Sequence, residues 1–486
     1  MRGISMELGF RSAGFVARQI KNGRLSCVDA LEYFIRRVEA FDGRLNAVVV
    51  RDFERARRQA RALDRNRASL DCLPPLYGVP MTVKESFDVA GLPTSWGVEA
   101  FRSNVAADDA VAVARLKRAG AVIFGKTNVP VMLMDWQSRN PVYGGTANPW
   151  DIARTPGGSS GGSAAALAAG LTALETGSDI GGSIRDPAHY CCVYGHKPSW
   201  NVIPAQGHAL GPGHAATDIS VVGPMARSAG DLARALAAMA GPLPTEPGLR
   251  LVLPKPRATA LKGLRVAIMA EHPRCPVAAE IRAAFAGLAH HLRREGALVD
   301  EAARPDADLD AGDDLYRMLR NAALSGRLPD AEAERLRAKL ARPHDPEEMQ
   351  PARDMLMDHR NWLRRHEERC RHRAAWRGFF RSFDVMLTPV GATAAPLHDD
   401  SGPLWRRTIM VDGEPVNAAR QLFWAGLASM PLLPATAAPL GFTGSGLPFG
   451  MQIIGAPYDD RTTIAVAGLL EKSWLDFSKP DGYADG

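Results

Sequence analysis

Apolar residues recur at helical spacing in the first part of the chain. Between residues 26 and 41, the sequence SCVDALEYFIRRVEAF places apolar side chains three or four positions apart. Ser26 stands where a helix N-cap is expected, and Asp29 follows three positions later, which is typical of a first helical turn. The pattern predicts that residues 1–64 form N-terminal helices whose role is packing.

Short apolar runs then alternate with glycine and proline, which is typical of α/β proteins. AVARLKRAGAVIFGKTNVP predicts a helix, a glycine turn and a strand at residues 121–124, and the alanine-rich residues 164–174 predict a packed helix. LRVAIMA, FDVMLTPV and GLPFGMQIIG predict buried strands further on. We expect one large sheet in a single domain spanning residues 1–486, with a catalytic core at 65–240 and the last part of that core at 384–486.

The character of the chain changes between residues 306 and 383, where charged helix replaces the strand pattern. Nine arginines lie between Arg353 and Arg381, but acidic residues such as Asp358 and Glu367 are interleaved with them. Alternating charges are typical of a solvated helix face, so nucleic-acid binding is the weaker interpretation. We expect a helical layer or insertion here, and a lid over the active site is one role for it.

Composition and charge exclude several classes of protein. Hydrophobic residues make up 46% of the chain and charged residues 23%, as in globular proteins, and the net charge of +6 is too small to predict nucleic-acid binding. No signal-peptide pattern and no apolar run of about 20 residues is present, so we expect no transmembrane segment. Six cysteines without a CxxC pair predict neither a metal site nor a disulfide framework, and a cytoplasmic location fits best.

Residues 155–187, TPGGSSGGSAAALAAGLTALETGSDIGGSIRDP, are rich in glycine and serine and admit several interpretations. A flexible linker is excluded by the helix-forming alanines, and a phosphate-binding loop is excluded because no lysine follows the glycines at the required spacing. Residues 157–161 formally match the GxSxG nucleophile elbow. The preceding NPWDIARTP is no buried strand, however, and the last histidine, His398, has its acidic neighbours after it.

Two glycine-flanked serines and one lysine remain: Ser159 in PGGSSGG, Ser183 in DIGGSIR, and Lys84 in GVPMTVKES. This set resembles the amidase signature family. The resemblance covers most of the chain through several motifs in the family's order, which are GVPMTVKESFDVAG, GKTNVP, NPWDIARTPGGSSGGSAAA, GSDIGGSIRDPA, GHKP and GLPFGMQIIG followed by DDRTT.

The resemblance implies a fold and a set of site residues. The fold would be a single α/β domain with a mixed sheet of about eleven strands covered by helices on both faces. Lys84 matches the family's lysine, Ser159 its bridging serine in a cis peptide after Gly158, and Ser183 its nucleophile. The backbone N–H groups of Ile180, Gly181, Gly182 and Ser183 match its oxyanion hole. No cofactor and no metal are implied.

The chemistry of these residues requires a neutral lysine. A serine hydroxyl is a weak nucleophile and needs a base, and no histidine stands at a recognisable position relative to Ser183. Val83 and the apolar residues before it indicate a desolvated site, which would favour the uncharged amine of Lys84. In the scheme that the resemblance implies, Lys84 takes a proton from Ser159, which takes one from Ser183 as that oxygen attacks the carbonyl.

Neighbouring polar residues are expected to support this site. Ser160 and Ser178 would supply hydrogen bonds, while Arg185 and Asp179 would brace the loop rather than contact substrate. Four histidines flank the site in sequence, and we interpret them as structural: His189, His196, His208 and His214.

The chain departs from the family's pattern near the pocket. Glu175 stands where a small residue is usual, Cys192 stands where glycine is common, and KPSWNVIP replaces the usual KPT.G. NVPVMLMDWQS replaces the EFAMGS that is typical of the amidase component of tRNA-linked amidotransferases. Within it, Leu133, Met134 and Trp136 either line an apolar pocket for an acyl or aryl group or pack in the core.

Three hypotheses follow. The first is a hydrolase of a small, apolar or aryl amide, with esters, anilides or carbamates as further candidates. The second is the ammonia-supplying component of an amidotransferase, which would need a partner, and the third is a binding protein with the same fold. A homodimer is one candidate oligomeric state.

Overall fold

The computed structural model describes residues 7–69, 72–211, 213, 215–342 and 349–484. The α-helices are α1 (Ala13–Lys21), α2 (Cys27–Phe41), α3 (Phe53–Asn66), α4 (Val111–Arg118), α5 (Gly161–Ala168), α6 (Arg185–Cys191), α7 (Ala229–Met239), α8 (Ala279–Arg294), α9 (Leu309–Leu324), α10 (Asp330–Leu340), α11 (Gln350–Met355), α12 (His359–Ser382), α13 (Leu422–Ser429) and α14 (Asp460–Ser473). The strands are β1 (Val48–Arg51), β2 (Pro80–Lys84), β3 (Val122–Thr127), β4 (Arg139–Asn140), β5 (Gly144–Gly145), β6 (Glu175–Asp179), β7 (Tyr194–Lys197), β8 (Val221–Ala226), β9 (Arg265–Ile268), β10 (Leu298–Asp300), β11 (Val385–Pro389), β12 (Thr408–Val411), β13 (Glu414–Asn417), β14 (Ala435–Phe442) and β15 (Pro448–Ile454).

The main sheet is mixed and has eight strands in the order β10-β9-β11-β15-β14-β7-β8-β6. Neighbours β10, β9 and β11 run parallel, whereas every pairing from β11 to β6 is antiparallel. The three buried strands predicted from LRVAIMA, FDVMLTPV and GLPFGMQIIG are β9, β11 and β15, and they lie next to one another. The expectation of one large mixed sheet is therefore confirmed.

The number of strands in this sheet differs from the expected eleven, because three strands form a separate sheet in the order β1-β3-β2. β2 lies beside β6 but does not join it through a backbone ladder. The Thr82 N–H donates instead to the Thr172 hydroxyl at 3.0 Å, and the Lys84 N–H donates to the Thr176 hydroxyl at 3.2 Å. Side-chain hydroxyls thus take the place of main-chain acceptors at the junction between the two sheets.

Helices cover both faces of the main sheet, and β7 shows how. Side chains alternate between the two faces of a strand. A Cβ on Gly195 would lie 2.7 Å from a side-chain carbon of Ile184, which caps α6. His196, the next residue of β7, bonds instead to Asp460 of α14 at 3.2 Å. α6 and α14 therefore lie on opposite faces, and α6 approaches the sheet closely because Gly195 has no side chain.

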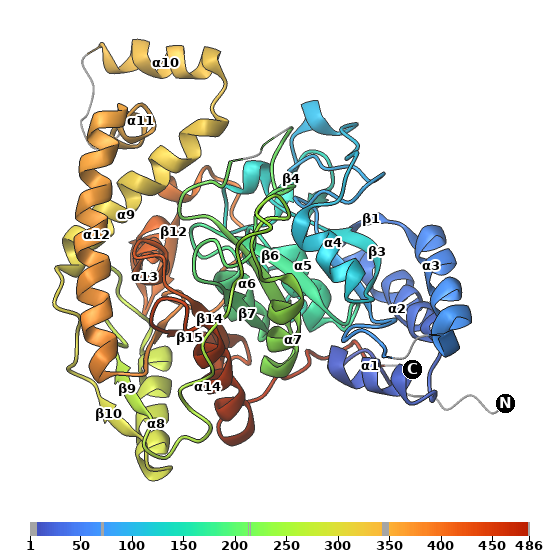
Figure 1. The fold of residues 1–486 in the computed structure, drawn as a ribbon. Helices are drawn as coiled ribbons and strands as arrows, with labels where there is room; N and C mark the ends of the chain where they lie inside the picture. The colour runs from blue at the N-terminus through green and yellow to red at the C-terminus, as the bar shows by residue number, and fades with distance from the viewer. Residues whose placement is uncertain (1–6, 70–71, 212, 214, 343–348, 485–486) are drawn as a thin grey trace.

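The described residues of the region 306–383, which are 306–342 and 349–383, are mainly helical, as expected. Figure 1 shows α9, α11 and α12 side by side at one edge of the molecule, far from α1, α2 and α3. α9 contacts α11, α12 and α13, which connects this helical layer to the C-terminal part of the core.

Two local predictions were wrong. Residues 1–64 are not all helical, because residues 48–51 form β1, which pairs antiparallel with β3. The helix predicted at 164–174 begins earlier and ends earlier, at Gly161–Ala168. It ends there because Gly170 adopts the left-handed conformation, with φ of 68°, and the chain turns into β6.

Cys192 occupies a position that favours glycine. It terminates α6 in the left-handed conformation, with φ of 59° and ψ of 36°. A non-glycine residue there costs on the order of 1 kcal/mol, and a glycine would adopt this conformation without that cost.

In the part of the chain that is described, no helix combines the length and the hydropathy that crossing a membrane requires.

Candidate active site

Lys84 is fully buried at the end of β2, with 0% of its surface exposed. Its Nζ lies 2.7 Å from the Ser159 hydroxyl, 3.0 Å from that of Ser160 and 2.9 Å from that of Ser178. The structure therefore brings together four of the residues singled out from the sequence. Three hydroxyls around one buried amine make an arrangement that can pass protons without a histidine.

The peptide bond between Gly158 and Ser159 is cis. The Gly158 N–H donates to Asp186 at 3.0 Å, and a Cβ on Gly158 would lie 2.3 Å from the carbonyl oxygen of Asp135. Only glycine fits this close approach between two chain segments. Burial raises the pKa of the Asp186 carboxyl well above its ordinary value.

Ser183 stands in the tight loop that connects β6 to α6. Its side chain is 5% exposed, and its carbonyl oxygen accepts from the Ser160 N–H at 3.1 Å. This bond holds the segments that carry Ser159 and Ser183 beside each other. Among the described residues, however, the hydroxyls of Ser159 and Ser183 are not hydrogen-bonded to one another.

The four loop residues expected to form an oxyanion hole, 180–183, differ in what their N–H groups do. The Gly182 N–H donates to Asp179 at 2.9 Å. Across the described ranges, the N–H groups of Ile180, Gly181 and Ser183 have no hydrogen-bond partner. Donors of this kind are available to a ligand, whereas the Gly182 N–H is already used to shape the turn.

The carbonyl groups of the same loop are held by two aromatic side chains. Trp136 Nε1 donates to the Gly181 oxygen at 2.9 Å, and the Tyr316 hydroxyl donates to the Ile180 oxygen at 2.9 Å. The sequence did not predict the contact of Tyr316, because Tyr316 is 136 residues from Ile180 in the chain and α9 carries no motif.

Asp179 and Arg185 brace the loop, as expected. Arg185 donates to Asp179 at 3.0 and 2.9 Å, and the Arg185 side chain also reaches Gln452 at 2.7 Å. Burial opposes ionisation of Asp179, but the Arg185 charge and the Gly182 N–H outweigh it and lower the pKa of this carboxyl to about 2. Asp179 is therefore ionised over the working range of pH.

Ser183 opens into a cavity of about 300 Å³. Leu133, Met134 and Trp136, the three candidate pocket residues, line it, and Trp136 also packs in a buried hydrophobic cluster with Tyr316 and Leu422. The opposite wall comes from α9, α11 and the segment before α13 and was not predicted. Its residues include Arg317, Arg320, Asn321, Leu324, Asp354, Met355, Leu404 and Leu422.

The histidines near the site have structural contacts. His189 bonds to the main chain of Gly450 and Thr393, at 2.8 and 2.9 Å, while His208 contacts the Ser86 hydroxyl at 3.0 Å. His214 lies outside the described residues. No group of three or more His, Cys, Asp or Glu side chains within the described ranges could hold a metal ion.

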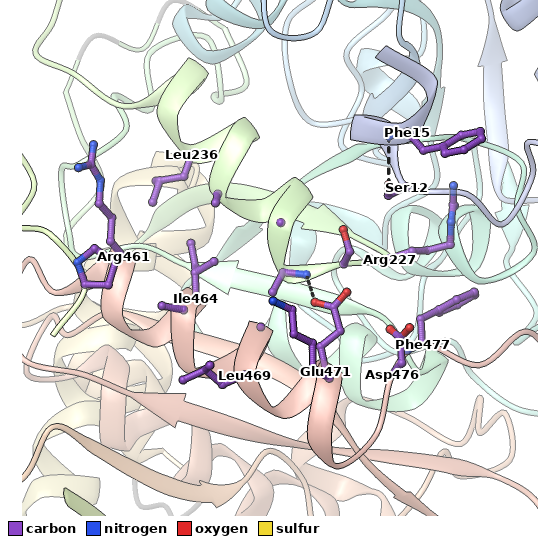
Figure 2. Close-up of a pocket in the computed structure, with 18 of the residues that line it drawn as sticks. Ser12, Phe15, Arg227, Leu236, Arg461, Ile464, Leu469, Glu471, Asp476 and Phe477 are labelled. Atoms are coloured by element: carbon purple, nitrogen blue, oxygen red, sulfur yellow. Dashed lines mark hydrogen bonds between the residues drawn. The ribbon is translucent and has the colours of Figure 1, made fainter. Parts of the chain in front are cut away.

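A larger cavity, of about 1110 Å³, lies elsewhere, between α1, α7 and α14. Figure 2 shows its walls, with Ser12 and Phe15 on one side and Ile464 and Leu469 on another. None of the candidate catalytic residues lines it. The size of a cavity therefore does not identify the active site in this protein.

Comparison with known proteins places the chain in a family. The Amidase family model matches residues 29–464. Indoleacetamide hydrolase of Bradyrhizobium diazoefficiens is 33% identical over 470 residues, which cover 95% of this chain and 86% of that protein. One component of the glutamyl-tRNA(Gln) amidotransferase of Anaeromyxobacter sp. is 32% identical over 492 residues, 96% of either chain.

A solved structure has the same fold. It comes from an inhibitor-bound vestigial protein complex that reveals the evolutionary origins of an s-triazine catabolic enzyme. It superimposes with a TM-score of 0.81 at 30% identity, covering 96% of this chain and all of that one. The matching fold, the matched length and the relatives agree, and the chain belongs to the amidase signature family of hydrolases.

Proposed function

We propose that this protein hydrolyses the C–N bond of a carboxylic amide through an acyl-enzyme on Ser183. The observation that carries the proposal is the buried Lys84 amine, bonded to Ser159 beside a loop with three unused N–H donors. Such an arrangement supplies a base, a relay and an oxyanion site without any cofactor.

The first half of the reaction acylates the enzyme. Neutral Lys84 accepts the Ser159 hydroxyl proton while Ser159 accepts the Ser183 proton, and the Ser183 oxygen forms a bond to the amide carbonyl carbon. The C–N bond of the tetrahedral intermediate then breaks as the proton returns from Lys84 through Ser159 to the leaving nitrogen. Water repeats these steps and releases the acid, which restores the Ser183 hydroxyl.

The negative charge that develops on the carbonyl oxygen needs donors, and the unused N–H groups of Ile180, Gly181 and Ser183 are the ones proposed to supply them. One such donor is worth about 3 kcal/mol of barrier. Because Trp136 and Tyr316 hold the adjacent carbonyl groups, the loop is already in place before substrate binds.

The pocket favours a small substrate with an apolar or aryl part. Its apolar wall includes Leu133, Trp136, Leu324 and Leu422, and its volume is about 300 Å³. A relative named for hydrolysis of indoleacetamide, an aryl amide, supports this assignment. We also propose that the helical region 306–383 acts as the lid of this pocket, because α9 and α11 supply one wall of it.

Substitution of the three catalytic residues tests the mechanism. Ser183→Ala and Lys84→Ala should each lower kcat by roughly 10⁴-fold or more, because the nucleophile or its base is lost, while Ser159→Ala should leave a small residual rate. The assay is hydrolysis of a panel of aryl amides, fatty amides, amino-acid amides and carbamates. Near-normal turnover by Ser183→Ala would overturn the assignment.

The second candidate is the ammonia-supplying component of an amidotransferase, which the 32% identity to such a protein favours. Residues 133–136, which line the pocket, differ from the pattern of those components. Purification from the native host tests this alternative: a stoichiometric partner protein would support it, whereas full activity of the isolated chain on free amides supports the proposal above.

A further inference from the structure

A half-buried arginine with an enclosed Nε borders the catalytic loop. Arg320 belongs to α9 and lines the same cavity as Ser183. Its Cδ lies 3.9 Å from the position that a Cβ on Gly181 would take, and the Tyr316 hydroxyl lies beside that position at 3.4 Å. The charge of Arg320 is thus held next to the loop proposed to bind the reacting carbonyl.

Arg320 has no carboxylate partner. Its Nη2 donates to the Asn321 side-chain oxygen at 3.0 Å, whereas its enclosed Nε bonds to no other described residue. Within the described part of the chain it makes no ion pair. Arg317, one turn earlier on α9, differs, because its Nε pairs with Asp313 at 3.0 Å. Desolvation by burial lowers the pKa of Arg320, and an unpaired guanidinium in such a place is unfavourable.

Carboxylates on the pocket walls are engaged elsewhere. Asp354 accepts hydrogen bonds from Asn321 at 3.0 Å and from Gln350 at 2.7 Å. Asp135 pairs with Arg407 at 3.0 Å. Among the described residues, Asp313 acts on Arg320 only through its charge and no carboxylate pairs with it directly, so the guanidinium is available to bind an anion in the pocket.

We propose that Arg320 binds a carboxylate of the substrate, so that the preferred substrates are small amides that combine an apolar part with one carboxylate. This inference rests on the proposed amide hydrolysis. Arginine pairs with carboxylates through two parallel hydrogen bonds, and the remaining walls, which include Leu133, Leu324, Met355 and Leu422, suit the apolar part.

Matched substrates test the inference and locate the carboxylate. Succinanilate carries the charge on the acyl side and is compared with valeranilide. N-butyryl-4-aminobenzoate carries it on the amine side and is compared with butyranilide. We expect one of the two anionic amides to have a kcat/KM at least tenfold above its neutral counterpart. Arg320→Met should reduce that ratio to about one, and Arg320→Lys should keep part of it.

Arg317→Met serves as the matched control. It removes a guanidinium that lies on the same helix and lines the same pocket but is already paired with Asp313. The ratio of anionic to neutral kcat/KM should stay at its wild-type value in this variant. Where turnover of an anilide is too slow to measure, the same four compounds are tested as competitors of fluorophosphonate labelling. The ratio of their inhibition constants then gives the preference.

The outcomes separate the inference from the function on which it rests. The role of Arg320 would be overturned if neutral and anionic amides react or compete equally well, or if the preference for the anionic amide persists in Arg320→Met. Neither result would contradict amide hydrolysis. Absence of both turnover and labelling in the wild type would overturn the two together.

Discussion

At the scale of single residues, the site shows which side chains a motif can identify. Lys84, Ser159 and Ser183 were recognisable because they lie in short, glycine-punctuated motifs. Tyr316 and Arg320 were not, because their roles depend on a helix packed against the loop from more than 130 residues away in the chain. Sequence spacing predicts chemistry within a loop, whereas contacts between distant elements need the fold.

Glu175 stands where the family usually has a small residue, and this difference has a clear consequence for stability. It is fully buried, its Oε2 accepts from the Thr176 N–H at 2.8 Å, and its Oε1 finds no donor among the described residues. Burial raises the pKa of this carboxyl from its ordinary 4.5 to about 7, against hydroxyls nearby that lower it. The folded state therefore favours the protonated form.

This shift predicts a pH-dependent loss of stability. The contribution of Glu175 is fully present below pH 4.5 and is lost as the pH rises through 7, since the unfolded chain ionises first. Glu175→Gln mimics the neutral acid and should exceed the wild type by about 3 kcal/mol at pH 8, with little difference near pH 4.5. Melting temperatures of both proteins across this range measure the effect. A constant gap between them would contradict it.

At the scale of elements, strongly patterned segments were predicted well and element boundaries were not. The buried strands β9, β11 and β15 have continuous apolar runs, and the region 306–383 has the charge pattern of helices. β1 was missed because four residues, Val48–Arg51, are too few to show an alternation and lie between the two helices α2 and α3. The split into two sheets depends on the hydroxyls of Thr172 and Thr176, which no sequence pattern indicates.

Two helical glycines give a test of packing at this scale. A Cβ on Gly162, in α5, would lie 2.3 Å from the main-chain nitrogen of Asn128, whereas a Cβ on Gly378, in α12, would meet nothing within 4 Å. Gly162→Ala should therefore destabilise the protein by about 3 kcal/mol. Gly378→Ala, the matched control, should stabilise it by about 0.5 to 1 kcal/mol, because alanine is the better helix former.

Melting temperatures at a fixed heating rate compare the two glycine variants. Shifts in opposite directions are expected, with the larger fall for Gly162→Ala. Equal shifts would show that α5 does not press against residue 128 as described.

At the scale of the whole molecule, the site is assembled from distant parts of the chain. The two sheets meet at β2 and β6, which places Lys84 beside the segment of Ser159. Residues of α9 and α11 line the cavity into which Ser183 opens. The family motifs in the sequence cover the segments that carry Lys84 and Ser159. The pocket wall on α9 and α11 has no motif, so the preference for substrate could be inferred only from the structure.

The central claim is that Ser183 is the oxygen that becomes acylated and that Lys84 activates it. Labelling with a fluorophosphonate, followed by mass spectrometry of the digested protein, tests this most directly. The account predicts one adduct, on Ser183, that disappears in Ser183→Ala and forms at least 100-fold more slowly in Lys84→Ala. An adduct on another serine, or undiminished labelling of Ser183→Ala, would contradict it.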